Sequence, residues 1–167
     1  MISKFNGNKS DMGYILDLMN DNLKYHISLD VRFKKYVKDF YEDAYTESKF
    51  KEDIQNAYRI YLVKFYGKVI GFASIKHHDD NTLSINEIYL DAKYRKMGYG
   101  KKLVEFALND IKHSLFLSVL SSNTNAINFY KHMGFIEVDR ETIEEGVPII
   151  NMYIDYNNVY NRKYGLL

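Results

Sequence analysis

The feature that most constrains the fold is a basic, glycine-containing turn at residues 95–101, which reads Arg-Lys-Met-Gly-Tyr-Gly-Lys. An apolar strand pattern ends just before it, at Leu90, and an apolar helical pattern runs after it from Leu103 to Ile111. The first N–H groups of a helix are unpaired and carry partial positive charge, so a turn at this place is suited to bind a phosphate or diphosphate.

The residue types of the turn suit an anion but do not by themselves prove one. Gly98 and Gly100 remove side chains where backbone approaches a ligand closely, and Arg95, Lys96 and Lys101 add positive charge. A glycine turn with a solvated basic flank is an equally open interpretation. A Walker-type loop is excluded, because it needs four residues between its glycines and a following Lys-Ser/Thr. A dinucleotide fingerprint is excluded too, because it needs three glycines near the first strand.

The patterns around the turn predict the fold class. Strand patterns cover residues 2–5, 60–65, 69–75, 82–90, 115–119, 135–140 and 147–154. Helical patterns cover a segment from Ser10 and Asp11, which would cap it, one or two helices within 30–57, and residues 98–112 and 124–133. This order predicts a mixed α/β (α+β) fold with a central, mostly antiparallel twisted sheet flanked by helices.

Composition narrows the function classes. The 167 residues contain one Pro and no linker-like segment, so we expect one domain over residues 1–167. Absence of Cys excludes thiol chemistry and thiolate metal sites. With 23 Lys and Arg against 22 Asp and Glu, there is no general electrostatic reason to bind nucleic acid or membranes. No signal-like or spanning apolar segment is seen, so we expect a cytoplasmic protein.

A second motif changes the interpretation of the turn. Residues 123–135 read Asn-Thr-Asn-Ala-Ile-Asn-Phe-Tyr-Lys-His-Met-Gly-Phe. Arg-x-x-Gly-x-Gly at 95–100, followed by Asn-x-x-Ala-x-x-Phe-Tyr-x-x-x-Gly-Phe, resembles the GNAT superfamily of acetyl-CoA-dependent N-acetyltransferases. The strand and helix order extends this resemblance over about residues 60–154, which would form the cofactor-binding core.

The resemblance implies a site for acetyl-CoA. The end of the third meander strand would pair its backbone with the pantetheine arm, and the amides of the turn would wrap the pyrophosphate. Asn123 would hydrogen-bond the cofactor arm, and Tyr130 would place its hydroxyl near the sulfur. The implied cofactor-binding residues are Ile88, Tyr89, Leu90, Arg95, Lys96, Met97, Gly98, Tyr99, Gly100, Lys101, Asn123 and Tyr130.

Acetyl transfer to an amine needs a neutral nucleophile, a stabilised oxyanion and a proton for the leaving thiolate. The Leu90 N–H is a candidate to polarise the thioester carbonyl, and Tyr130 is a candidate acid, with simple packing on its apolar helix face as the alternative. Glu87 is the candidate base, acting through water, and a structural or substrate-binding role is the alternative. Strand alternation predicts that Glu87 shares a face with Ile85 and Tyr89.

Metal chemistry is not expected. His77 and His78 are adjacent in a predicted turn, which is poor ligand geometry, and the remaining histidines are isolated in the sequence. We therefore predict no metal.

The acceptor is the least constrained part. The run from Phe33 to Phe135 is most similar to bacterial spermidine/spermine acetyltransferases of the PaiA type. Carboxylates for a polyamine would come from Asp30, Asp39, Glu42, Asp43 and Glu47, among the aromatics Tyr36, Phe40, Tyr41 and Tyr45. Interspersed lysines leave a solvated helix face open. Acetylation of a protein or peptide amine, or an acetyl-CoA-sensing module without turnover, are the alternatives. The final strand and the tail 156–167 are candidates for a homodimer contact.

Overall fold

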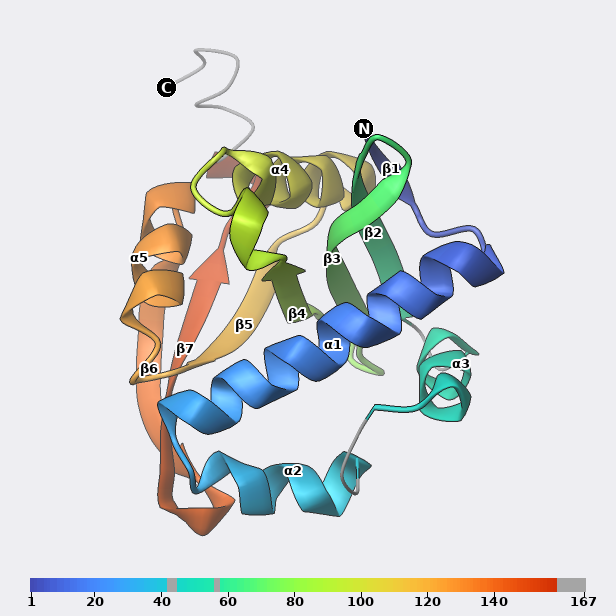
Figure 1. The fold of residues 1–167 in the computed structure, drawn as a ribbon. Helices are drawn as coiled ribbons and strands as arrows, with labels where there is room; N and C mark the ends of the chain where they lie inside the picture. The colour runs from blue at the N-terminus through green and yellow to red at the C-terminus, as the bar shows by residue number, and fades with distance from the viewer. Residues whose placement is uncertain (42–44, 56–57, 159–167) are drawn as a thin grey trace.

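The computed structural model describes residues 1–41, 45–55 and 58–158 of the chain (Figure 1). The strands are β1 (Ile2–Lys4), β2 (Tyr58–Phe65), β3 (Lys68–His77), β4 (Leu83–Leu90), β5 (Leu115–Leu120), β6 (Ile136–Ile143) and β7 (Val147–Ile154). The helices are α1 (Lys9–Leu29), α2 (Phe33–Tyr41), α3 (Glu47–Gln55), α4 (Tyr99–Ile111) and α5 (Thr124–Met133), with 3-10 turns η1 (Ala92–Tyr94) and η2 (Glu144–Gly146).

The described strands form one sheet in the order β1-β2-β3-β4-β5-β7-β6. All neighbours are antiparallel except β4 and β5, which run parallel and join two antiparallel halves. This confirms the predicted mixed α/β fold with a mostly antiparallel sheet and flanking helices.

The helices cover the two faces of the sheet. Because successive strand residues point to opposite faces, Tyr61 and Val63 pack with α4 and α5, whereas Ile60 and Leu62 pack with α1 and α3. Figure 1 shows α1 crossing one face of the sheet, with α2 and α3 on the same side. A third, smaller apolar cluster joins the end of α1 and the start of α2 to β5 and β7.

Most predicted elements are confirmed within one to three residues of their ends. The predicted Gly134 end of α5 is also confirmed, because Gly134 has φ 98° and closes the helix in the left-handed conformation. The expected cap of α1 was wrong. The cap is Asn8, whose side chain accepts from the N–H groups of Ser10 and Asp11, whereas Asp11 lies in the first turn, where its charge suits the helix dipole. Asp11 also pairs with Lys64 at 2.6 Å.

The expected alternation along β4 was also wrong. A register shift lies between the pairs Ser74–Glu87 and Ile75–Ile85, so Asn86 is an extra residue in β4. Ile85 therefore packs toward α4, whereas Glu87 and Tyr89 lie on the face covered by α1 and α3. The bulge turns Glu87 away from the face that Ile85 occupies.

Candidate active site

The sheet splits between β4 and β5. The two strands are joined by a single pair, Ser84 with Phe116, and no later pair joins them in the described residues. On the other side β4 stays paired with β3 up to Leu90. The edge of β4 that faces β5 is therefore open over its last residues.

Backbone groups of β4 point into this split. The Asp91 N–H donates to the Ile70 carbonyl of β3 at 2.9 Å. Since hydrogen-bonding direction alternates along an antiparallel strand, Tyr89 also faces β3, whereas Ile88 and Leu90 direct their backbone groups toward β5. The side chains of Ile88 and Leu90 pack against the cluster beneath α4 and α5. Two predicted cofactor-binding residues thus offer main-chain groups to an extended ligand.

The turn after β4 delivers the N-terminus of α4 to the end of the split. Lys96 and Gly98 have φ of 60° and 81°, and the left-handed Gly98 is the cap residue of α4. No side chain caps this helix. The N–H groups of its first turn, which begins at Tyr99, are consequently available to an anion.

Gly98 and Gly100 are required in the turn for different reasons. A Cβ on Gly98 would meet no atom within 4 Å, so space does not require glycine there. The left-handed backbone of Gly98 is what favours glycine at this position. A Cβ on Gly100 would lie 3.4 Å from the Leu90 side chain and from the Phe129 ring, so Gly100 allows α4 to pack closely on β4 and α5.

The other residues of the turn divide into exposed and packed side chains. Lys96, Met97 and Lys101 are exposed beside the helix end. The Tyr99 ring is partly covered and lies 6.5 Å from the Tyr94 ring, centroid to centroid. The exposed lysines supply positive charge next to the free N–H groups.

Arg95 is occupied by protein contacts. Its Nε donates to the Leu90 carbonyl at 2.9 Å, and its guanidinium lies 5.4 Å from the Tyr25 ring and 5.0 Å from the Tyr89 ring. Cation–π contacts of this kind stabilise the position of the turn. Arg95 therefore fixes the turn to β4 and to α1, a function that its charge alone did not reveal.

Asn123 is the cap residue of α5, Tyr130 lies within the helix, and both are buried. The Asn123 Oδ1 caps α5 by accepting from the Ala126 N–H at 3.2 Å, and it also accepts from the Tyr25 hydroxyl at 3.4 Å. Its side-chain NH₂ has no partner among the described residues. Asn123 thus has a structural function and a spare donor.

The Tyr130 ring packs between Phe129 and Phe135, with centroids 5.3 and 5.4 Å away. No described residue is hydrogen-bonded to its hydroxyl. Burial raises the pKa of Tyr130 above its ordinary value, so the phenol stays protonated at neutral pH. The Tyr130 ring therefore does pack in the core, and its hydroxyl still has a proton to donate.

Glu87 lies on the opposite face from the α4 cluster, beneath α1 and α3. Its Oε2 is buried without a hydrogen-bond partner, and burial together with the Asp53 carboxylate raises its pKa to about 8. Asp53 of α3 accepts from the Tyr45 hydroxyl and pairs with Lys49 at 3.2 Å. A carboxyl group with this pKa exchanges protons readily near neutral pH.

Sequence reasoning missed Asp53, Tyr25 and Ser74. Ser74 carries the one available signal, since it is the only hydroxyl residue in the apolar run from Val69 to Ile75 of β3. Tyr25 and Asp53 are ordinary helix residues in the sequence, and only the packing of α1 and α3 on the sheet brings them to this region.

The proposed polyamine groove finds no support in the described residues. Asp30 pairs with Arg32 at 2.6 Å, and Glu47 pairs with Lys51 at 2.5 Å. The side chains of Tyr36, Asp39, Phe40, Tyr41, Glu42 and Asp43 lie outside the described part of the chain. Ion pairing at the two described acids is what a solvated, mixed-charge helix surface shows.

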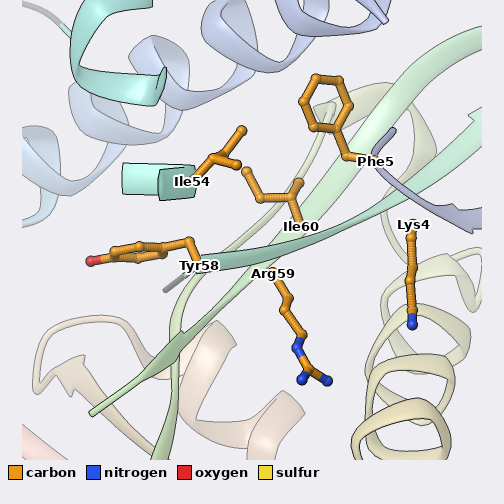
Figure 2. Close-up of a pocket in the computed structure, with 6 residues that line it drawn as sticks. All are labelled: Lys4, Phe5, Ile54, Tyr58, Arg59 and Ile60. Atoms are coloured by element: carbon orange, nitrogen blue, oxygen red, sulfur yellow. The ribbon is translucent and has the colours of Figure 1, made fainter. Parts of the chain in front are cut away.

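A separate small cavity of about 160 Å³ lies at the edge of the sheet, where β1 ends beside β2. Figure 2 shows Lys4 and Arg59 on one side of the strand and Phe5, Ile54 and Ile60 on the other. None of the predicted site residues lines it. The split between β4 and β5 is therefore the better candidate for a functional site.

The described residues hold neither a three-residue metal cluster nor a helix that could span a membrane. Burial lowers the pKa of His26 to about 4. In residues 1–41, 45–55 and 58–158, no three His, Asp or Glu side chains come together as a metal site would require. None of the helices in that part of the chain is long and apolar enough to cross a bilayer.

Fold and site together present an open strand edge that ends at an uncapped helix N-terminus, an arrangement that suits an extended ligand with an anionic group. Comparison with known protein families identifies the class of protein that has this arrangement. The chain belongs to the acetyltransferase (GNAT) family, whose model matches residues 25–135.

The curated relatives match part of this chain. The peptidyl-lysine N-acetyltransferase YjaB of Salmonella typhimurium is 34% identical over 71 residues, which are 41% of this chain and 48% of that protein. The chain spans between 48% and 61% of the length of the curated relatives it matches.

Two solved structures extend the comparison. The smu.2055 protein of Streptococcus mutans has a TM-score of 0.76 at 21% identity, covering 93% of this chain and 99% of that one. A Bacillus anthracis protein assigned as a streptothricin acetyltransferase, solved with acetyl coenzyme A, has a TM-score of 0.55 at 26% identity, covering 59% and 62%.

Proposed function

We propose that this chain is an N-acetyltransferase that transfers the acetyl group of acetyl-CoA directly to a primary amine. The observation that carries the proposal is the uncapped N-terminus of α4 at the end of the open edge of β4. That pairing of free N–H groups with an unpaired strand edge suits a ligand with a diphosphate and an amide-containing arm. Residues 1–167 would act as one domain, with the cofactor-binding core over about 60–154.

The residues of the split would share the cofactor as follows. Main-chain groups of Ile88 pair with the pantetheine amides, the Leu90 N–H is left for the thioester carbonyl, and Tyr89 holds Arg95 and so the turn. The N–H groups from Gly98 to Lys101 bind the diphosphate, with Lys96 and Lys101 adding charge and Met97 at the exposed rim. The free NH₂ of Asn123 donates to the cofactor arm.

Acetyl-CoA supplies the acetyl group as a thioester. Glu87, as carboxylate, takes one proton from the acceptor ammonium, directly or through a water, and the neutral amine attacks the thioester carbonyl carbon. The Leu90 N–H donates to the carbonyl oxygen while it carries negative charge. As the carbon–sulfur bond breaks, Tyr130 gives its proton to the thiolate, and the proton lost by the new amide restores Tyr130. The products are an N-acetyl amine, free coenzyme A and one proton on Glu87.

The acceptor we favour is a primary amine of a small molecule such as a polyamine, and the alternative is the lysine side chain of a peptide or protein. The lysine arm is included because a relative carries the name peptidyl-lysine N-acetyltransferase. Nothing in the described helices favours several positive charges over one.

Two assays test the proposal. Calorimetry or thermal shift with CoA and acetyl-CoA should show saturable binding to the full chain. Release of free thiol from acetyl-CoA should then appear with at least one amine in a panel of polyamines, aminoglycosides and lysine peptides. No binding of either cofactor would refute the proposal, and tight binding without turnover on any amine would favour the acetyl-CoA-sensing alternative.

Self-association and location are separate proposals. We propose a homodimer and a cytoplasmic location. The final strand β7 is paired on both sides, with β5 and β6, so it offers no free edge for the dimer contact, and residues 159–167 of the tail lie outside the described residues. Light scattering of the purified chain at several concentrations tests the first.

A further inference from the structure

Two buried side-chain oxygens, Ser74 Oγ and Glu87 Oε2, have no hydrogen-bond partner in the described residues. They belong to residues directly opposite each other on β3 and β4. Side chains of opposite residues leave the same face with Cβ atoms about 5 Å apart. Since the next pair, Phe72 and Tyr89, packs with α1 and α3, the Ser74 and Glu87 side chains lie side by side beneath those helices.

The buried hydroxyl of Ser74 destabilises the fold unless it forms a hydrogen bond in some state of the protein. Ser74 is 1% exposed, inside a strand whose neighbours are apolar. A buried hydroxyl without a partner is destabilising, and an alanine would fill the position without that penalty. The residue opposite it is the candidate base.

The two oxygens of Glu87 have different surroundings. The residue as a whole is partly exposed, whereas Oε2 is buried and has no hydrogen-bond partner. Rotation of Ser74 between its staggered χ1 positions can direct the hydroxyl at a group on the opposite Cβ. Oε2 therefore has a potential donor beside it, and Oε1 is the oxygen left for the acceptor.

We propose that Ser74 is a positioning residue for Glu87: its hydroxyl donates to Glu87 Oε2 when the carboxyl group ionises, and so holds Oε1 toward the acceptor amine. This inference rests on the proposed function of Glu87 as the base. The hydrogen bond favours the charged form of Glu87 and opposes the effect of burial.

The charged and titratable groups on the surrounding elements are few. From α3, the Asp53 carboxylate raises the pKa of Glu87, and Lys49 is paired with Asp53. From β2, Tyr58 interacts with both carboxylates, and Lys76 of β3 lies 5.7 Å from the Tyr58 ring. From α1, Asp21 acts on Tyr89, the next residue on this face of β4. None of these groups donates a hydrogen bond to Glu87, and the Ser74 hydroxyl is the neutral donor on the residue directly opposite it.

The first test reads the Glu87 carboxyl directly, by ¹³C NMR titration of the full chain without cofactor. Ser74→Ala should raise the pKa of Glu87 by about one pH unit, because a hydrogen bond to a charged group is worth about that much. Ser74→Thr keeps the hydroxyl and should stay closer to the wild-type value. Ser118→Ala is the matched control, since Ser118 lies exposed on β5 and bonds Asn151. An unchanged Glu87 pKa in Ser74→Ala overturns the proposal.

The second test separates Ser74 from the base itself. In Ser74→Ala the acidic limb of the pH profile of kcat/KM should shift to higher pH, by the same amount as the pKa of Glu87 measured by NMR. A lower rate without that shift would mean that Ser74 has a merely structural effect, and it would refute the positioning function. Wild-type turnover in Glu87→Gln would refute the base function on its own, whereas the NMR titration would still report whether Ser74 contacts Glu87.

Discussion

The buried carboxyl group of Glu87 should make the stability of the protein fall as the pH rises. The pKa of this group is about 8 in the folded chain against an ordinary value of 4.5. Between these values the folded state binds a proton that the unfolded state lacks, so the contribution is complete below pH 4.5 and is lost as the pH rises toward 8. Glu87→Gln keeps the shape and removes the titration.

The size of the effect follows from the pKa difference. One unit of pKa corresponds to about 1.4 kcal/mol, so between pH 5 and pH 9 the wild type should lose about 4 kcal/mol that the variant keeps. The difference in unfolding free energy, variant minus wild type, should rise across that interval and level off above pH 8. Other titrating groups are common to both proteins and cancel in the difference.

Urea unfolding followed by circular dichroism, at unit steps from pH 5 to pH 9, measures this difference. Glu144→Gln is the matched control, because the same change at an exposed carboxylate of η2 should give a flat difference. A flat difference for Glu87→Gln as well would mean that Glu87 titrates normally in the folded protein. The base assignment would then lose its electrostatic support.

Three substitutions test the split in the sheet. Tyr130→Phe should lower turnover by about 10²-fold or more while leaving cofactor affinity nearly unchanged, since only the proton donor is removed; equal turnover would remove the acid role. Gly98→Glu should abolish acetyl-CoA binding in calorimetry through repulsion of the diphosphate, whereas Gly98→Ala, with the same left-handed strain, should retain measurable binding; retained binding in the glutamate variant would contradict the turn as an anion site. Gly71→Ala places a Cβ against the Leu90 side chain and 2.7 Å from the Tyr89 carbonyl, so it should destabilise the chain by about 1–3 kcal/mol in urea and weaken cofactor binding; a silent substitution would show that the end of β4 is not held tightly.

Local patterns predicted the elements well because they depend on nearby residues. The apolar face of α4 and the Gly134 end of α5 are determined within a few residues, and both were placed correctly. The bulge at Asn86 has no such local mark. It arises where β4 leaves its regular pairing with β3, so the face that Glu87 occupies could not be read from alternation.

In the candidate site, too, the features that depend on nearby residues were predicted, and those that depend on tertiary packing were not. The turn at 95–101 and the motif at 123–135 were visible because they are contiguous in sequence. Asp53 and Ser74 lie on α3 and β3 and reach Glu87 only through tertiary packing, so no spacing rule connects them. The same holds for Arg95, whose partners Tyr25 and Tyr89 come from α1 and β4.

Tyr25 contacts Arg95 with its ring and Asn123 with its hydroxyl. One side chain of α1 thus bridges the entry to α4 and the cap of α5, the two helices that border the split. The long helix that covers the Glu87 face of the sheet is in this way also tied to both helices beside the split. Under the proposed function, a change in α1 that alters the acceptor would have to keep Tyr25, because its loss would also remove these two contacts.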